Sequence, residues 1–207
     1  LGVSYTYNVH AVNSIGDSAA GTSNAQVFGD VPAKVVISLV QALAGLAVKI
    51  DWAEPATNGY GISTYLVEYT IDSGSNWNTV GTTANLTLNH SSLTEATLYE
   101  YRVSATNALG TGVVSDTSSS VIAGDVPDAP SGHSATAQTG NEIDLAWTEP
   151  DDHEYSIDEY RIYRSLTSGG TYTLLVDGLT GLTYTDSSLA DGQDYYYKIQ
   201  AHNSLGW

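Results

Sequence analysis

Carboxylates and histidines are the side chains of this 207-residue chain whose types could support catalysis or metal binding. Glu54 and Glu149 occupy equivalent positions in two copies of an internal repeat, each just before a proline. A glycosidase acid and base need carboxyl groups within roughly 5–10 Å of each other, which separate modules do not provide. The five histidines show no ligand spacing, and His10 and His202, at outward strand positions, are expected to be solvated. With no phosphate loop, zinc-protease motif or nucleophile elbow in the sequence, we predict no catalytic residues and no enzymatic activity.

An acidic stretch at 149–159, EPDDHEYSIDE, is the strongest candidate for a metal site. Asp151, Asp152 and Glu154 offer hard oxygen ligands, and calcium takes roughly six to eight of these. The stretch lacks EF-hand spacing, however, and the matching stretch at 54–64 has lost nearly all of its acids. A solvated acidic loop is therefore the reading we favour, and no cofactor is predicted. Weaker calcium candidates lie in the linkers: Asp30, Asp125 and Asp128.

Two tripeptides fit the N-glycosylation pattern Asn-x-Ser/Thr, with Asn85 and Asn89 as the acceptors. Such tripeptides also arise by chance in a sequence rich in Ser and Thr. Glycans on these residues are therefore expected only if the protein is exported by a glycosylating organism.

The charge balance is strongly acidic, with 23 Asp and Glu against 6 Lys and Arg and a formal net charge of -17. Such a surface repels phosphate backbones and anionic membranes, so we predict no nucleic-acid binding and no membrane insertion of this segment. The chain has no cysteine, which excludes disulfides, cysteine nucleophiles and thiolate metal sites. Solubility is the simplest reason for the acidity.

Internal repetition is the dominant feature of the sequence. The stretch YTYNVHAVNSIGDSAAG at 5–21 returns as YEYRVSATNALGTGVVS at 99–115 and as YYYKIQAHNSLGW at 195–207. A second stretch, from DVP to the Trp-x-Glu-Pro motif at 30–55, aligns without gaps on 125–150, which begins 95 residues later. The chain is thus predicted to be a tandem array.

Within each copy the apolar residues recur at every second position, as in half-buried strands. Val48, Ile50 and Trp52 share one face, while Lys49 and Asp51 share the other. Short strands of this kind, separated by turn signals such as NG, SGS, SGG and DG, predict an all-β fold of antiparallel sandwiches with about 100 residues per module.

These landmarks resemble the fibronectin type III family of immunoglobulin-like sandwiches, and the resemblance covers essentially the whole chain. In the middle copy they are Trp52, Pro55, Ile62, Tyr65, Val67, Tyr69, Leu93, Tyr99, Val103, Ala105, Asn107, Gly110 and Ser115. In the last copy they are Trp147, Pro150, Ile157, Tyr160, Ile162, Leu189, Gly192, Tyr195, Ile199, Ala201, Asn203 and Gly206. One departure is that Glu95 and Ala96 stand where the family has a Pro-Gly turn.

The resemblance implies structural roles for the aromatic landmarks. Trp52 and Trp147 are expected to fill the space between the two sheets of their modules. Tyr99 and Tyr195 are expected at tyrosine corners, with buried rings and hydroxyls bonded to nearby backbone. Tyr5, in the first copy of the same motif, is likewise predicted to belong to a core.

The repeats predict three modules: the last two strands of one at 1–28, a complete one at 29–124, and one without its last strand at 125–207. We expect the chain to be a window on a longer array. An alternative is that a neighbouring chain adds its residues 17–28 to the open edge of the last module. Short proline-containing linkers at 27–34 and 123–130 predict restricted hinging between modules.

The function predicted is that of a structural or adhesive segment, a rigid spacer in an exported cell-surface or filament-forming protein. Its expected partners are like modules of the same or neighbouring chains, and glycans. The alternatives are a spacer or carbohydrate-binding appendage of a secreted polysaccharide-degrading enzyme, and a virion tail or fibre component. Tyr60 and Tyr155 lie on loops where they could offer aromatic faces to sugars or cap the end of a sandwich. Integrin binding gains no support, because the chain has no Arg-Gly-Asp tripeptide.

Overall fold

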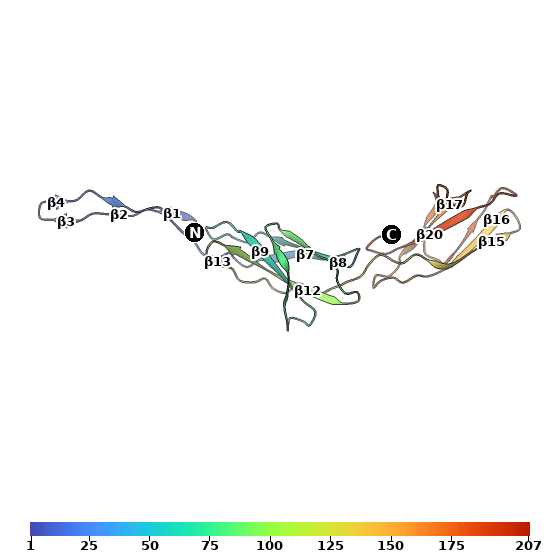
Figure 1. Ribbon diagram of the computed structural model, residues 1–207, viewed down its shortest axis with the longest axis horizontal. Coiled ribbons are helices and arrows are strands. Elements are labelled where there is room, and N and C mark those ends of the chain that lie inside the picture. Colours follow the sequence, from blue (N-terminus) through green and yellow to red (C-terminus); the bar gives the residue numbers. More distant parts are fainter. The chain divides into compact units, whose positions relative to one another are not determined.

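The computed structural model describes all residues, 1–207, as short strands and loops (Figure 1). No helix in the chain is long and apolar enough to cross a membrane. Contacts between residues divide the chain into two compact units. The first comprises Leu1–Gln41, Lys49–His90 and Tyr99–Val121, and the second comprises Ala42–Val48, Ser91–Leu98 and Ile122–Trp207.

The N-terminal segment forms an interrupted antiparallel ribbon. It consists of three strand pairs: β1 (Val3–Tyr5) with β6 (Gln26–Phe28), β2 (Asn8–Val9) with β5 (Gly21–Thr22), and β3 (Val12–Asn13) with β4 (Gly16–Asp17). No second sheet covers the ribbon in this chain, and every residue from Leu1 to Phe28 is exposed. Tyr5 is 48% exposed in this ribbon, and its predicted place in a core stays a prediction.

The middle module contains two sheets. One has the order β11-β8-β7 and the other the order β10-β9-β12-β13, with β14 also paired to β12. The strands of the first sheet are β7 (Val36–Leu43), β8 (Ala47–Ala53) and β11 (Thr87–His90). Those of the second are β9 (Thr64–Thr70), β10 (Asn78–Thr83), β12 (Leu98–Asn107), β13 (Gly110–Thr111) and β14 (Val121–Ile122).

The last module repeats this plan with sheets β15-β16-β19 and β18-β17-β20. Its strands are β15 (Ser131–Gln138), β16 (Glu142–Thr148), β17 (Glu159–Ser165), β18 (Thr173–Leu179), β19 (Thr183–Asp186) and β20 (Tyr196–His202). Register repeats as well as order, because Val67 pairs with Val103 in the middle module and Ile162 pairs with Ile199 at the equivalent positions. The predicted all-β tandem sandwich is confirmed.

The predicted alternation of side chains places the two landmark tryptophans inside. Trp52 is 3% exposed and Trp147 is 5% exposed. Each packs on a tyrosine of the opposite sheet, Trp52 on Tyr65 with ring centroids 5.4 Å apart and Trp147 on Tyr160 at 5.5 Å. Burial of such large apolar rings stabilises each sandwich.

The predicted module boundaries stay a prediction. They fall between strands, since β6 ends at Phe28 and β7 begins at Val36, while β14 ends at Ile122 and β15 begins at Ser131. The contact-based second unit nevertheless includes two loops of the middle module, at 42–48 and 91–98.

Candidate functional site

The residues considered for metal binding are not brought together by the fold. No group of three or more His, Asp or Glu side chains is placed to hold a metal ion. Asp151 accepts a hydrogen bond from the amide of His153 at 3.0 Å, and Asp152 accepts one from the amide of Glu154 at 3.1 Å. These carboxylates thus stabilise their own loop. Glu54 and Glu149 are both exposed, on the segments that follow β8 and β16.

The histidines fall in different environments. His10 and His133 are exposed. His202 differs from the solvated position expected of it, because its Nδ1 lies 2.7 Å from Oδ1 of Asp158 and its ring centroid lies 4.7 Å from that of Trp207. His90 lies between the sheets of the middle module, where burial lowers its pKa.

The two candidate glycosylation acceptors are both exposed. Asn85 precedes β11, and Asn89 occupies an outward position within it.

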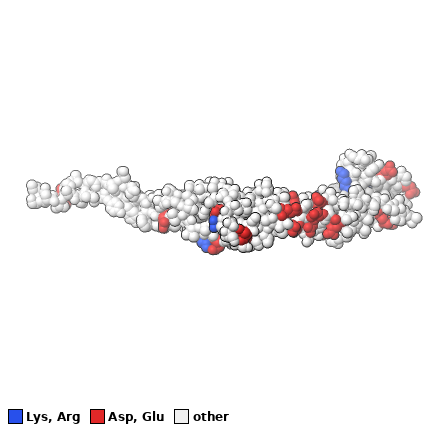
Figure 2. Space-filling view, turned by 60° about the horizontal axis from the view of Figure 1, so that its bottom comes forward, with Lys and Arg blue, Asp and Glu red and all other residues white.

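Acidic side chains dominate the charged groups seen in Figure 2, with few Lys and Arg among them.

Two tyrosines at predicted corners are placed differently by the structure. Tyr99 is buried, whereas Tyr195 is half-buried and its hydroxyl accepts a hydrogen bond from the amide of Ala190 at 3.0 Å. The latter bond is the one expected of a tyrosine corner.

A repeated set of contacts holds each linker against the loop that follows strand β8 or β16. Tyr60 donates its hydroxyl to the carbonyl of Val27 at 3.0 Å, and Tyr155 donates to that of Ile122 at 2.9 Å. The two hydroxyls therefore bond to β6 and β14, the strands at which the linkers begin. We call these sets of contacts the first junction and the second junction.

Backbone and asparagine contacts are also shared. The amide of Asp30 donates to the carbonyl of Asn58 at 2.9 Å, and that of Asp125 donates to the carbonyl of His153 at 3.3 Å. The linker carbonyls of the same two aspartates each accept a bond of 2.8 Å from a buried asparagine side chain, Asn107 in the first junction and Asn203 in the second.

Each junction requires a glycine for its close approach. A Cβ on Gly29 would lie 2.6 Å from the carbonyl oxygen of Asn58, and one on Gly124 would lie 2.2 Å from that of His153. Sequence reasoning counted Asn107 only among the family landmarks and overlooked both glycines. The signal that could have found them is their recurrence at equivalent positions of the repeat.

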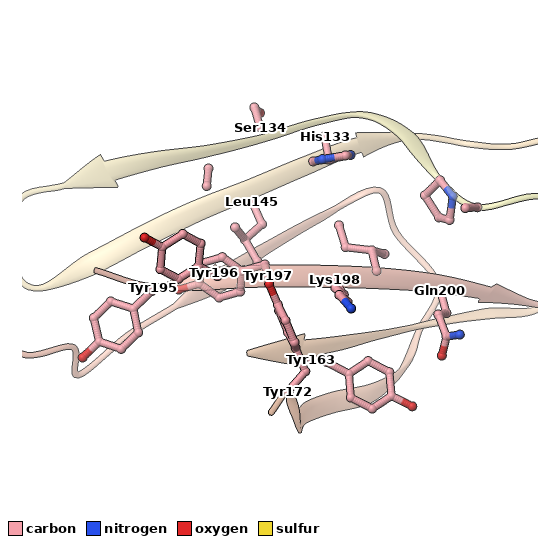
Figure 3. A pocket seen from close by; sticks show the side chains of 14 residues that line it. His133, Ser134, Leu145, Tyr163, Tyr172, Tyr195, Tyr196, Tyr197, Lys198 and Gln200 are labelled. Carbon is pink, nitrogen blue, oxygen red and sulfur yellow. The ribbon is translucent and has the colours of Figure 1, made fainter. Parts of the chain in front are cut away.

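A groove of about 720 Å³ opens between β15 and β20 in the second unit. In Figure 3, His133 and Ser134 lie on β15, while Tyr197, Lys198 and Gln200 lie on β20 across the opening. Its lining is mainly apolar and aromatic, with these further members: Leu145, Tyr163, Tyr172, Tyr195 and Ile199.

The middle module shows what lies along the strand equivalent to β20. Residues 112–118 run beside β12, and the amides of Ser115 and Ser118 donate to the carbonyls of Val103 and Tyr101 at 2.9 Å. In return the amides of Val103 and Tyr101 donate to the two serine hydroxyls at 3.0 Å. The equivalent strand of the last module, β20, pairs with β17.

The fold and the repeated junctions define a tandem β-sandwich protein. Comparison with known proteins gives a match of residues 128–207 to the family described as "Fibronectin type III domain". The crystal structure of chicken CNTN1 FN1-FN3 domains superimposes with a TM-score of 0.56 at 19% identity, covering 97% of this chain and 73% of that one. Residues 128–207 therefore match the fibronectin type III family, and the fold of the chain is like that of the solved FN1-FN3 domains.

Relatives with higher identity are large proteins of several kinds. An amylopullulanase of Thermoanaerobacterium saccharolyticum is 36% identical over 39% of this chain, and chitinase A1 of Niallia circulans is 29% identical over 77%. Receptor-type tyrosine-protein phosphatase F of Mus musculus is 27% identical over 98%. The chain spans only 6%, 22% and 11% of these three proteins, respectively.

Proposed function

We propose that the chain is a non-catalytic spacer of an exported protein, in which fixed linkers hold consecutive sandwich modules at a set separation. The repeated junction is the observation that carries this proposal. A linker bonded through a tyrosine hydroxyl, a backbone amide and a buried asparagine loses much of the freedom that a solvated linker of the same length would have. Export is supported by the kinds of protein in which related modules occur.

Small-angle X-ray scattering of the whole chain tests the spacer role. The double variant Tyr60→Phe, Tyr155→Phe removes one hydrogen bond from each junction and keeps both rings. We expect its distribution of interatomic distances to broaden relative to the unmodified chain. Tyr172→Phe, which changes a tyrosine of the groove, is the matched control. Identical distributions for all three proteins would contradict the proposal.

A second candidate function is that of an appendage of a polysaccharide-degrading enzyme. The names of two relatives, amylopullulanase and chitinase A1, favour it. Co-sedimentation of the chain with insoluble starch and chitin separates the candidates, because a carbohydrate-binding appendage is depleted from the supernatant and a plain spacer stays in it.

The partner we propose is a like module of the same or a neighbouring chain, with an extended strand that pairs along β20. The serine-bearing segment 112–118 beside β12 supplies the chemistry, since its hydroxyls and backbone groups pair with the equivalent strand of the middle module. A synthetic peptide with the sequence of residues 111–121 is titrated onto the chain, with the amides of Tyr197 and Ile199 followed by NMR. Changes in the amide chemical shifts that saturate with peptide concentration support the proposal. We expect no such changes with a peptide in which Ser115 and Ser118 are replaced by valine. Unchanged amides would reject it.

A further inference from the structure

The two junctions differ in chemistry at one position. Asn58 of the first junction donates from Nδ2 to the carbonyl of Val31 at 2.8 Å. Its counterpart in the second junction is His153, and both residues have left-handed backbones, with φ of 52° and 49°. The backbone path is thus conserved while a neutral amide is exchanged for a group that titrates near neutral pH.

Carboxylates surround the imidazole of His153. Its Nδ1 is bonded to Glu95, which comes from the turn between β11 and β12. Its Nε2 lies 3.5 Å from Oδ1 of Asp128 in the linker. Asp151, on the same loop as His153, adds a further negative charge nearby. Glu95 stands where the family has the proline of its Pro-Gly turn. The residue that departs from the family pattern is thus the one that contacts His153.

We propose that His153 is a proton-operated latch of the second junction, closed when the imidazolium bonds Glu95 and Asp128 together and loosened when the ring is neutral. A protonated ring donates from both nitrogens, whereas a neutral ring donates from only one. Loss of the proton therefore removes one of the two bonds and the ionic component of both. The turn that carries Glu95 also exchanges backbone bonds with the linker, through Ala96 N to Ala123 O and Ala123 N to Thr97 O, both at 3.0 Å.

The electrostatics agree with this direction. The bond to Glu95 is the largest cause that raises the pKa of His153, and Asp128 and Asp151 act in the same sense. A raised pKa means that the stabilising contribution is fully present below the ordinary histidine pKa and is lost as the pH rises through the raised value. The side chains of His153, Glu95 and Asp128 are 23%, 41% and 70% exposed, so salt screens the latch and its effect is modest.

NMR titration of the intact chain gives the first test. We expect the midpoint of His153 to lie above the ordinary histidine pKa of about 6.5. Glu95→Gln should lower this midpoint, because it removes the carboxylate that accepts from Nδ1. A midpoint of the unmodified chain at or below the ordinary value, or one that Glu95→Gln does not lower, would overturn the proposal.

Hydrogen exchange at the amides of Ala96 and Ala123 gives the second test. Between about pH 5.5 and about pH 8, their protection factors should fall about two- to fivefold in the unmodified chain, the range expected of an exposed ion pair. His153→Asn introduces the residue type found in the first junction, and asparagine tolerates the left-handed backbone. This variant should therefore fold, and its protection factors should not fall over this pH range. The amide of Asp30, in the first junction, is the control in both proteins. An equal fall in His153→Asn would reject the latch.

Discussion

The hydroxyl of Tyr197 donates to Oδ2 of Asp186 at 2.7 Å and thereby joins strand β20 of one sheet to strand β19 of the other. In the middle module the same two positions are held by Tyr101 and His90, whose Oη and Nδ1 are 3.2 Å apart. A buried tyrosine hydroxyl needs a partner, and the two modules meet this need with different chemistry. Arg164 completes the set in the last module, with Nη1 2.9 Å from Oδ2 of Asp186.

His90 makes the stability of the middle module depend on pH. Burial lowers its pKa, so the neutral ring is favoured in the folded state. The stabilising contribution is therefore present above the ordinary histidine pKa and is lost as the pH falls through the lowered value. We expect the urea concentration at the midpoint of unfolding, monitored by tryptophan fluorescence, to be lower at about pH 5 than at about pH 7.5. In His90→Phe this difference should shrink, and an undiminished difference would assign the effect to other groups.

Asp186→Ala should destabilise the last module by about 1–3 kcal/mol, because it leaves the half-buried guanidinium of Arg164 and the hydroxyl of Tyr197 without their acceptor. Thermal unfolding monitored by circular dichroism provides the measurement. Asp177→Ala, an exposed carboxylate on β18, is the matched control and should change the free energy of unfolding by less than about 0.5 kcal/mol. Similar losses in the two variants would show that the polar bridge between the sheets contributes little.

Trp52→Ala should lower the free energy of unfolding of the middle module by about 3–5 kcal/mol, the cost typical of truncating a buried aromatic side chain. Trp77 is the control, since it is only partly buried and its ring lies 4.2 Å from the guanidinium carbon of Arg102. Trp77→Ala should cost about 1 kcal/mol. Denaturant unfolding of both variants gives the comparison, and a cooperative transition of unchanged midpoint in Trp52→Ala would contradict its position in the core.

Gly124→Ala should distort the second junction, because the added methyl would lie 2.2 Å from the carbonyl oxygen of His153 and 2.7 Å from the ring of Tyr155. Relief of the overlap requires the linker to move, at a cost of about 1–3 kcal/mol. Gly181→Ala adds its methyl to open space and serves as the control. Amide chemical shifts of residues 122–126 should change in the first variant alone, and unchanged shifts there would mean that the linker is not held closely.

Much of the fold followed from local pattern. The period of two in Val48, Ile50 and Trp52 predicted one inward face, and these three residues are buried. The recurrence of this pattern predicted a second sandwich. Tyr5 marks the limit of such reasoning, because alternation along one strand does not say which sheet covers it.

The junctions were less predictable. Tyr60 and Tyr155 could be placed on loops, yet the choice between a solvent-facing ring and a cap depends on which carbonyl the folded linker presents. The pairing of Glu95 with His153 joins residues 58 positions apart. A single sequence gives no signal for such a contact beyond the missing Pro-Gly turn.

Each repeat carries the same residues of a junction. In the last module these are Gly124 and Asp125 before the first strand, and then Tyr155 and Asn203. A gene duplication that copies one whole period therefore also copies a working connection, without new mutations at the seam. Arrays of this kind can lengthen or shorten by whole repeats. Replacement of asparagine by histidine beside carboxylates such as Glu95 and Asp128 then gives one junction a titratable group that the other lacks.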